Sequence, residues 1–297
     1  MIIYALAIAV FLTVLVSGNN TSAVVGTLIG SRILNKYAGL LIAATGYVAG
    51  MILEGQKLHQ AAVLLFPPVY EVAIFALISS AILFVFAYFT KIPLSLTMAL
   101  VGSAIGLSIR YHYHIPETYL LTVIAAWILA PVISIIGAYY TNLYMNKTVH
   151  RNVWNYALLL KMILIVTSFF TAFTLGANTL GFIANIIGFN YLTVIVLSVS
   201  IFAGTFYLSS GVIKNVGQSM YLMKYTNAFT SQLISALVVE VSTVLSIPMS
   251  NTQTLTAGVL GSGLSYKSKA IYIKPFIYIV IMWIISPILG TLMAYIL

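Results

Sequence analysis

The sequence predicts an all-α polytopic membrane protein, and three observations support this fold class. Hydrophobic residues make up 62% of the 297 residues and charged residues only 6%, whereas charged residues form roughly a quarter of a soluble domain. Apolar segments recur along the whole chain. A chain of this length has room for about ten spans, because a helix needs ~20 residues to cross the hydrocarbon core. Polar, glycine-containing segments interrupt the apolar runs at matching places in the two halves.

The composition also excludes several classes of function. The chain has no cysteine, so disulfides, thiolate metal sites and thiol nucleophiles have no residues to form them. It has four glutamates and no aspartate, which leaves little for a paired-carboxylate hydrolase or a carboxylate-bound divalent metal. The net charge of +9 comes from Lys and Arg placed singly or in pairs between apolar runs, as in positive-inside loops. We therefore expect a lipid bilayer as the surrounding medium, no enzyme activity, no cofactor and no nucleic-acid partner.

The apolar segments are of two kinds. Most are long enough to span the membrane, and the first, 2–17, is expected to be a retained span. The alternative, a cleaved signal peptide, lacks a positive n-region and a small-x-small cleavage site. Segments 59–66, 94–109 and 251–264 are too short, or too rich in Gly, Ser and Thr, for a lipid-exposed helix. These three are expected to be half-helices or re-entrant pieces shielded by protein.

A polar stretch divides the chain near its middle. Residues 140–155 carry Lys147, His150 and Arg151 and no acidic residue, which predicts a basic cytoplasmic loop. The expected organisation is a first repeat half over 1–139, this loop, and a second repeat half over 156–297.

An internal repeat is the most informative feature of the sequence. IPLSLTMALVGSAIG begins at Ile92 and IPMSNTQTLTAGVLG at Ile247, and GNNTSAVVG at Gly18 is matched by GANTLGFIANIIG at Gly176. Both pairs are separated by about 155 to 159 residues, which indicates a duplicated unit. Interrupted hydrophobic segments at corresponding places in two halves point to the binding site of a transporter. Aligned without a gap, the first pair shares Ser95/Ser250, Thr97/Thr252 and Gly106/Gly261.

The P-x-S-x-T pattern at Pro93 and Pro248 suits an anion. Proline is favoured at the start of a helix, where its missing N–H would have no partner. The next N–H groups are unpaired and carry partial positive charge, and the Ser and Thr hydroxyls add donors. Two such helix starts facing each other would bind a tetrahedral oxyanion without burying a full charge. The alternative is that these hydroxyls only bond between helices, but the duplication favours the anion site.

These segments resemble the inorganic phosphate transporter (PiT) family. IPMSNTQTLTAGVLG is similar to the PVSTTHT-x-x-G signature that its members carry once in each half. The two upstream segments resemble its duplicated GANDVANAFGT motif. SGVIKNVGQSM at Ser210 resembles RVIKTVG, and NAFTSQLISA at Asn227 resembles GFAAELAAA.

The resemblance implies an inverted-repeat fold, phosphate as the usual substrate, Na⁺ or H⁺ as the driving ion, and the cell membrane as the location. A homodimer is left open. The substrate-binding positions carried over from the signatures are Ser95, Thr97, Ser250, Asn251, Thr252 and Gln253. The expected cation-coupling positions are Asn19, Asn20, Asn178, Thr179 and Gln232, with Asn19 and Asn178 near a Na⁺ at the ends of broken helices.

The chain departs from the family pattern mainly at acidic positions. Asn20 and Thr179 stand where the motif has Asp, and Gln232 stands where it has Glu. The signature His is replaced by Met98 and Gln253, and Leu96 replaces a Thr. The anion-binding hydroxyls therefore remain while the coupling carboxylates are lost, so sulfate or another oxyanion is an alternative substrate.

Glu240 is a further candidate, because an ionisable residue inside an apolar segment indicates function by default. It is expected to act in proton coupling or gating, and to supply an acceptor that separates phosphate from sulfate. The alternative is a structural carboxylate that is protonated or paired with a lysine. A channel or an intramembrane enzyme is disfavoured by the duplication and by the lack of a catalytic set.

Overall fold

The computed structural model describes residues 1–30, 32–90, 94–147, 153–209, 223–267 and 271–297, and these residues form helices and short connections without a strand. Seven stretches of helix in this part are long and apolar enough to cross a membrane, so the protein is an integral, multi-pass membrane protein. The helices in chain order are α1 (Ile2–Gly30), α2 (Lys36–Glu54), η1 (Gly55–Leu58), α3 (His59–Leu65), α4 (Tyr70–Thr90), α5 (Leu96–Tyr111), α6 (Glu117–Lys147), α7 (Val153–Leu175), the π-helical η2 (Gly176–Leu180), α8 (Gly181–Ile186), α9 (Tyr191–Leu208), α10 (Tyr225–Val244), α11 (Asn251–Lys267) and α12 (Lys274–Ile296).

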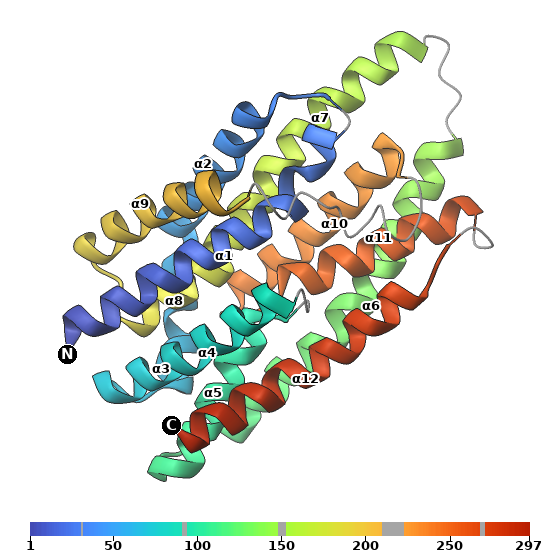
Figure 1. Cartoon of the computed structure of the whole chain (residues 1–297). Coiled ribbons are helices and arrows are strands. Elements are labelled where there is room, and N and C mark those ends of the chain that lie inside the picture. Colours follow the sequence, from blue (N-terminus) through green and yellow to red (C-terminus); the bar gives the residue numbers. More distant parts are fainter. Residues whose placement is uncertain (31, 91–93, 148–152, 210–222, 268–270) are drawn as a thin grey trace.

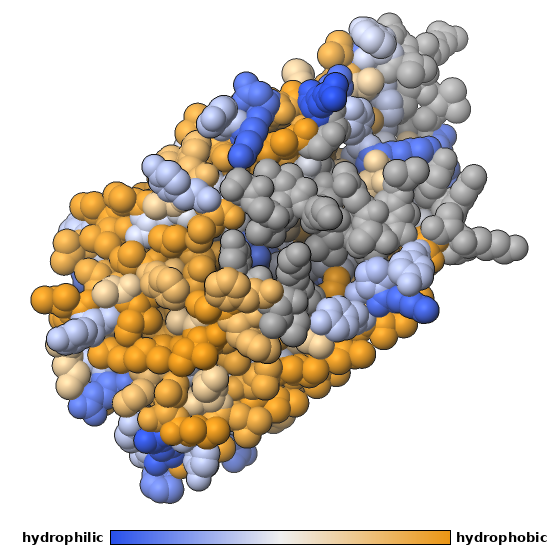
Figure 2. Space-filling view, in the orientation of Figure 1, coloured by the Kyte–Doolittle hydropathy of each residue, from blue (hydrophilic) through white to orange (hydrophobic). Residues whose placement is uncertain are grey.

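Apolar residues also dominate the outside of the bundle. On the face shown in Figure 2, hydrophobic residues cover the central region and hydrophilic residues gather toward the two ends of the molecule. Large side chains such as Phe89, Leu121 and Ile128 are strongly exposed. Such a surface is unfavourable in water and is expected where helices face lipid.

Two helical hairpins form the centre of the molecule. The α4–α5 and α10–α11 hairpins reach inward from opposite ends, and α5 and α11 both start near the middle in Figure 1. With 16 and 17 residues, α5 and α11 are shorter than a spanning helix of ~20 residues. The expectation of re-entrant pieces is confirmed for both. Each half of the chain contributes one hairpin, as two inverted repeats require.

The two repeats exchange their outer helices. Helix α6 of the first half packs along α11 of the second, and α12 of the second half packs along α5 of the first. The same exchange joins α1 to α9 and α2 to α7. Each half therefore needs the other to complete its core.

Matched glycines allow this exchange. A Cβ on Gly106 would collide with the Thr291 carbonyl of α12, and a Cβ on Gly261 would collide with the Ile135 carbonyl of α6. Small residues let membrane helices approach closely, and the shared glycine pair has this role in both repeats.

Two details differ from the sequence-based expectations. Helix α1 runs unbroken through Asn19, and Asn178 lies in the π-helical turn η2 between α7 and α8, so neither lies at the end of a broken helix. A π-helical turn contains one more residue than an α-helical turn and still pairs its backbone N–H and C=O groups. Such pairing is required inside a membrane, where no water is present to bind them. Residues 140–147 are the last turns of α6, so the predicted central loop is shorter than 140–155. The division into two halves at that loop stays a prediction.

Some predicted features fall outside the described residues. These are Pro93, the basic residues His150, Arg151, Lys214 and Lys269, and the segment SGVIKNVGQSM from Ser210.

Candidate functional site

A small polar cavity lies where the two hairpin tips meet. Its volume is about 20 Å³, which is room for about one water molecule. Among the residues that the structure describes, those that line it carry no charge. The polar lining consists of Asn20, Ser95, Thr97, Thr179, Ser250, Asn251 and Thr252, and the apolar lining of Phe84, Leu94, Leu96 and Leu175.

Ser95 and Ser250 occupy the same structural position in the two hairpins. Ser95 caps α5 and its Oγ accepts from the Met98 N–H at 3.4 Å. Ser250 precedes α11 and its Oγ accepts from the Gln253 N–H at 3.4 Å. Both residues are buried. The sequence produces this geometry because Ser is a preferred N-cap residue and extended backbone leads into each helix.

Threonine hydroxyls complete the polar wall. The Thr97 and Thr179 Oγ1 atoms lie 3.4 Å apart, which links the start of α5 to η2. The Ser250 Oγ and Thr252 Oγ1 atoms lie 3.0 Å apart at the start of α11. All four hydroxyls line the cavity and can turn their hydrogens toward a ligand, because hydroxyl rotors are free to choose a partner.

The arrangement favours a negatively charged ligand. The starts of α5 and α11 both open on the cavity, and helix N-termini carry unpaired N–H groups and partial positive charge. Several hydroxyls add neutral donors at the same place. An oxyanion is therefore the class of ligand that this chemistry suits.

Asn20 and Thr179, the two replacements of the family aspartates, also meet at the cavity. They come from α1 and η2, which occupy matching places in the two repeats. Asn19 is partly exposed and is not among the lining residues. Of the predicted Asn19–Asn20 pair, the structure thus brings only Asn20 to the site.

Asn178 holds the second hairpin tip. Its Nδ2 donates to the Thr243 Oγ1 and to the Ile247 carbonyl, each at 3.0 Å. Its Oδ1 accepts from the Met249 N–H at 2.8 Å. Every polar atom of this amide is used to fix the chain just before Ser250, so its observed contacts are those of a positioning residue.

Gln232 and Gln253, the two glutamines predicted for the site, are not among the residues that line the cavity. The Gln232 Oε1 accepts from the Ser168 hydroxyl at 2.9 Å and its Nε2 donates to the Val24 carbonyl at 2.9 Å, which ties α10 to α7 and α1. The Gln253 Nε2 donates to the Trp127 carbonyl at 2.8 Å. In this conformation neither side chain takes the substrate-facing or cation-facing place that was expected for it.

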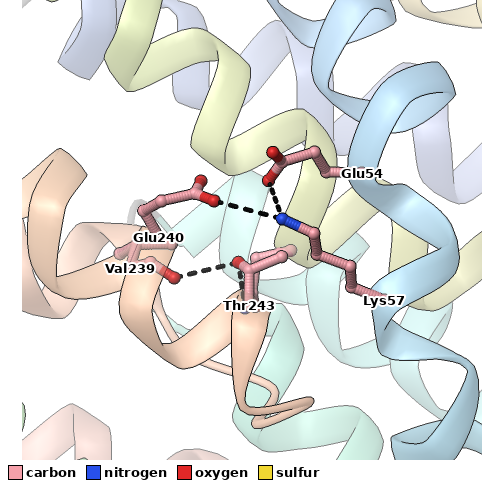
Figure 3. Close-up of polar contacts among 6 residues, drawn as sticks. Glu54, Lys57, Val239, Glu240 and Thr243 are labelled. Carbon is pink, nitrogen blue, oxygen red and sulfur yellow. Dashed lines mark hydrogen bonds and ion pairs between the residues drawn. The ribbon is translucent and has the colours of Figure 1, made fainter.

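Glu240 lies in a cluster with Glu54 and Lys57 (Figure 3). The Lys57 Nζ is 2.9 Å from a Glu54 carboxylate oxygen and 3.6 Å from a Glu240 oxygen. The cluster joins the end of α2 and η1 of the first repeat to α10 of the second and is partly exposed. Glu240 does not line the cavity, so it does not supply the acceptor expected of it there. Its lysine partner agrees with the structural alternative, and a role in coupling stays a prediction.

Sequence reasoning missed Glu54, Lys57 and the residues that anchor the second tip. The Trp127 Nε1 donates to the Pro248 carbonyl at 3.0 Å, and the Tyr119 hydroxyl donates to the Ser246 carbonyl at 2.7 Å. Glu54 could have been singled out from the sequence, because the chain has only four acidic residues. Nothing in the sequence marked the aromatic anchors, since their partners are backbone atoms more than a hundred residues away.

Two stretches of the chain match a known protein family. Residues 16–159 and 152–294 each match the phosphate transporter family. The chain belongs to the phosphate transporter family. The two matched stretches are the two halves that carry the hairpins, so the family's duplicated unit and the structural repeat coincide.

Members and structural relatives extend over nearly the whole chain. A Methanocaldococcus jannaschii protein named "Putative phosphate permease MJ0630" is 24% identical over 98% of this chain and 95% of its own. The Bacillus subtilis "Sulfate permease CysP" is 23% identical over 99% of this chain and 86% of its own. A solved structure titled "The sodium-dependent phosphate transporter" has the same fold, with a TM-score of 0.81, 16% identity and coverage of 99% and 97%.

Proposed function

We propose that this protein is a secondary transporter that carries inorganic phosphate through the membrane, driven by a Na⁺ or H⁺ gradient. The observation that supports this most directly is the meeting of two matching helix N-termini, capped by Ser95 and Ser250, at one uncharged polar cavity. Dipoles and hydroxyls at such a place attract an anion.

Movement of the hairpin tips is part of this proposal. The cavity of about 20 Å³ holds roughly one water, so the tips have to separate to admit a phosphate ion. The hairpins enter from opposite ends of the bundle (Figure 1). Rocking one repeat against the other would therefore expose the same site to one side of the membrane and then to the other.

The cation partner is the second part of the proposal. Asn20 and Thr179 offer neutral oxygens at the cavity, which suit Na⁺. The Glu54–Lys57–Glu240 cluster holds two carboxylates and one ammonium, so it can accept a proton or Na⁺ and become neutral. The charged groups facing Glu240 are Glu54 and Lys57 from the η1 side. Glu240→Gln tests this part: unchanged dependence of uptake on pH would remove Glu240 from coupling.

Sulfate is the second candidate substrate. The similarity to the Bacillus subtilis sulfate permease supports it, and hydroxyl and amide donors bind both tetrahedral anions. The two substrates are separated by direct competition in one assay.

The test is uptake of labelled phosphate and labelled sulfate into proteoliposomes under imposed Na⁺ or pH gradients. Ser95→Ala and Ser250→Ala should each weaken phosphate uptake, with an apparent KM raised roughly 3- to 30-fold for loss of one hydrogen bond to an anion. Ser103→Ala is the matched control, because its hydroxyl bonds to Ser79 on α4 and lies outside the cavity. If the wild-type protein accumulated neither anion, or neither cap substitution changed uptake, the proposed site would be wrong.

A further inference from the structure

The two hairpin tips differ in polarity at one position that lines the cavity. Ser95 matches Ser250 and Thr97 matches Thr252, but between them Leu96 matches Asn251. One side of the pseudo-symmetric cavity is thus apolar where the other carries an amide. An amide has a donor and an acceptor end, so its orientation decides which ligands it favours.

The hydrogen bonds favour one orientation of this amide. The Thr174 hydroxyl donates to the Thr171 carbonyl at 3.2 Å, which leaves its oxygen as an acceptor for another group. The Asn251 Nδ2 donates to this oxygen at 3.5 Å. A flipped amide would require the Thr174 hydroxyl to give up its bond to the Thr171 carbonyl, so in the observed arrangement the Oδ1 of Asn251 is the end left over.

This leftover acceptor belongs to a buried residue of the cavity wall. Asn251 is 6% exposed and lines the space between the tips. Its Oδ1 is buried and has no hydrogen-bond partner among the residues that the structure describes. A buried acceptor left unpaired costs about 1–3 kcal/mol, so a ligand that brings a donor to it gains affinity and a ligand that brings only lone pairs loses it.

Phosphate and sulfate differ in this property. At neutral pH phosphate keeps at least one P–OH group, which is a donor, whereas sulfate carries no proton and presents four acceptors. The hydroxyls and helix N–H groups of the cavity serve both anions equally. The Oδ1 of Asn251 does not, because it pairs with a P–OH and repels a sulfate oxygen.

We propose that Asn251, held by Thr174, is the residue that selects protonated oxyanions such as phosphate over sulfate. This inference rests on the proposed transport of an oxyanion at this site. It assigns the discriminating acceptor to the cavity wall and not to Glu240.

Binding and competition assays on the full-length protein test this assignment. Thr174→Val removes the acceptor for Nδ2 and lets the amide turn its donor end to the anion. The affinity ratio of phosphate to sulfate should then fall roughly tenfold, mainly through tighter sulfate binding. Asn251→Leu, which copies Leu96, should also lower the ratio, through weaker phosphate binding. Arsenate should follow phosphate, and molybdate should follow sulfate, in both variants.

The control is Thr171→Val, whose hydroxyl bonds only within α7, to the Thr167 carbonyl; its ratio should stay at the wild-type value. An unchanged ratio in Thr174→Val would overturn the assignment while leaving phosphate transport intact. A change in Na⁺ dependence without a change in the ratio would overturn it as well, since the Oδ1 would then be a cation ligand. Failure of the wild-type protein to bind either anion would instead refute the proposed function.

Discussion

Asn178 should be the residue on which the second hairpin tip depends most. Asn178→Ala removes three hydrogen bonds, to Thr243, Ile247 and Met249, and leaves the Ile247 carbonyl and the Met249 N–H buried without these partners. A net hydrogen bond contributes about 1 kcal/mol and an orphaned buried group costs about 1–3 kcal/mol. The lost bond to Thr243 and the two orphaned groups together predict a loss of stability of about 3–7 kcal/mol.

Thr243→Val is the graded comparison. It removes only one of the three bonds, since the Asn178 amide keeps Ile247 and Met249, and should cost about 1 kcal/mol. Unfolding of the purified proteins in a detergent titration, followed by tryptophan fluorescence, measures both values. Phosphate affinity measured on the folded fraction should also fall in Asn178→Ala, because the bonds hold the peptide directly before the Ser250 cap.

Equal stability of the two variants would refute the reasoning, because it would mean that the bonds to Ile247 and Met249 contribute nothing. Retained stability with lost affinity would contradict it too, and would make Asn178 a ligand of the anion or cation and not a support for the tip.

Three further predictions concern the packing and the cluster around the site. Gly106→Val and Gly261→Val should each destabilise the fold by about 1–3 kcal/mol or more, because the new side chain meets a backbone carbonyl of the exchanged helix. Gly188→Ala, at an exposed position with positive φ, is the comparison that shows the effect of losing a glycine without a packing collision. Trp127→Phe keeps an aromatic ring but removes the hydrogen bond to the Pro248 carbonyl, so phosphate affinity should fall a few-fold. Unchanged affinity would show that this bond does not hold the tip. Lys57→Met leaves Glu54 and Glu240 facing each other without their cation, so uptake should shift its pH dependence more than Glu54→Gln does; identical pH profiles of the two variants would show that Lys57 does not tune the pair.

The sequence determined the class of the protein and the composition of its site. Charge scarcity and repeated apolar runs require a lipid environment, whatever the tertiary fold. The duplicated P-x-S-x-T segments predicted that Ser95, Thr97, Ser250 and Thr252 lie together, and all four line one cavity. Capping chemistry is local, and the repeat offset equates the two helix starts. Span count was less predictable, since α5 and α11 are apolar but stop near the middle of the bundle.

Only the tertiary structure decided how the remaining polar residues are used. Asn20, Asn178, Gln232 and Gln253 are similar in type, yet one lines the cavity, one holds a hairpin tip and two tie helices together. The partners of Asn178 lie in its own repeat, whereas Gln232 and Gln253 donate to the Val24 and Trp127 carbonyls of the other repeat, which the exchange of helices brings close. The role of an amide depends on which donors and acceptors lie within about 3 Å of it. These groups come from segments that are distant in the sequence, and only the folded bundle brings them together.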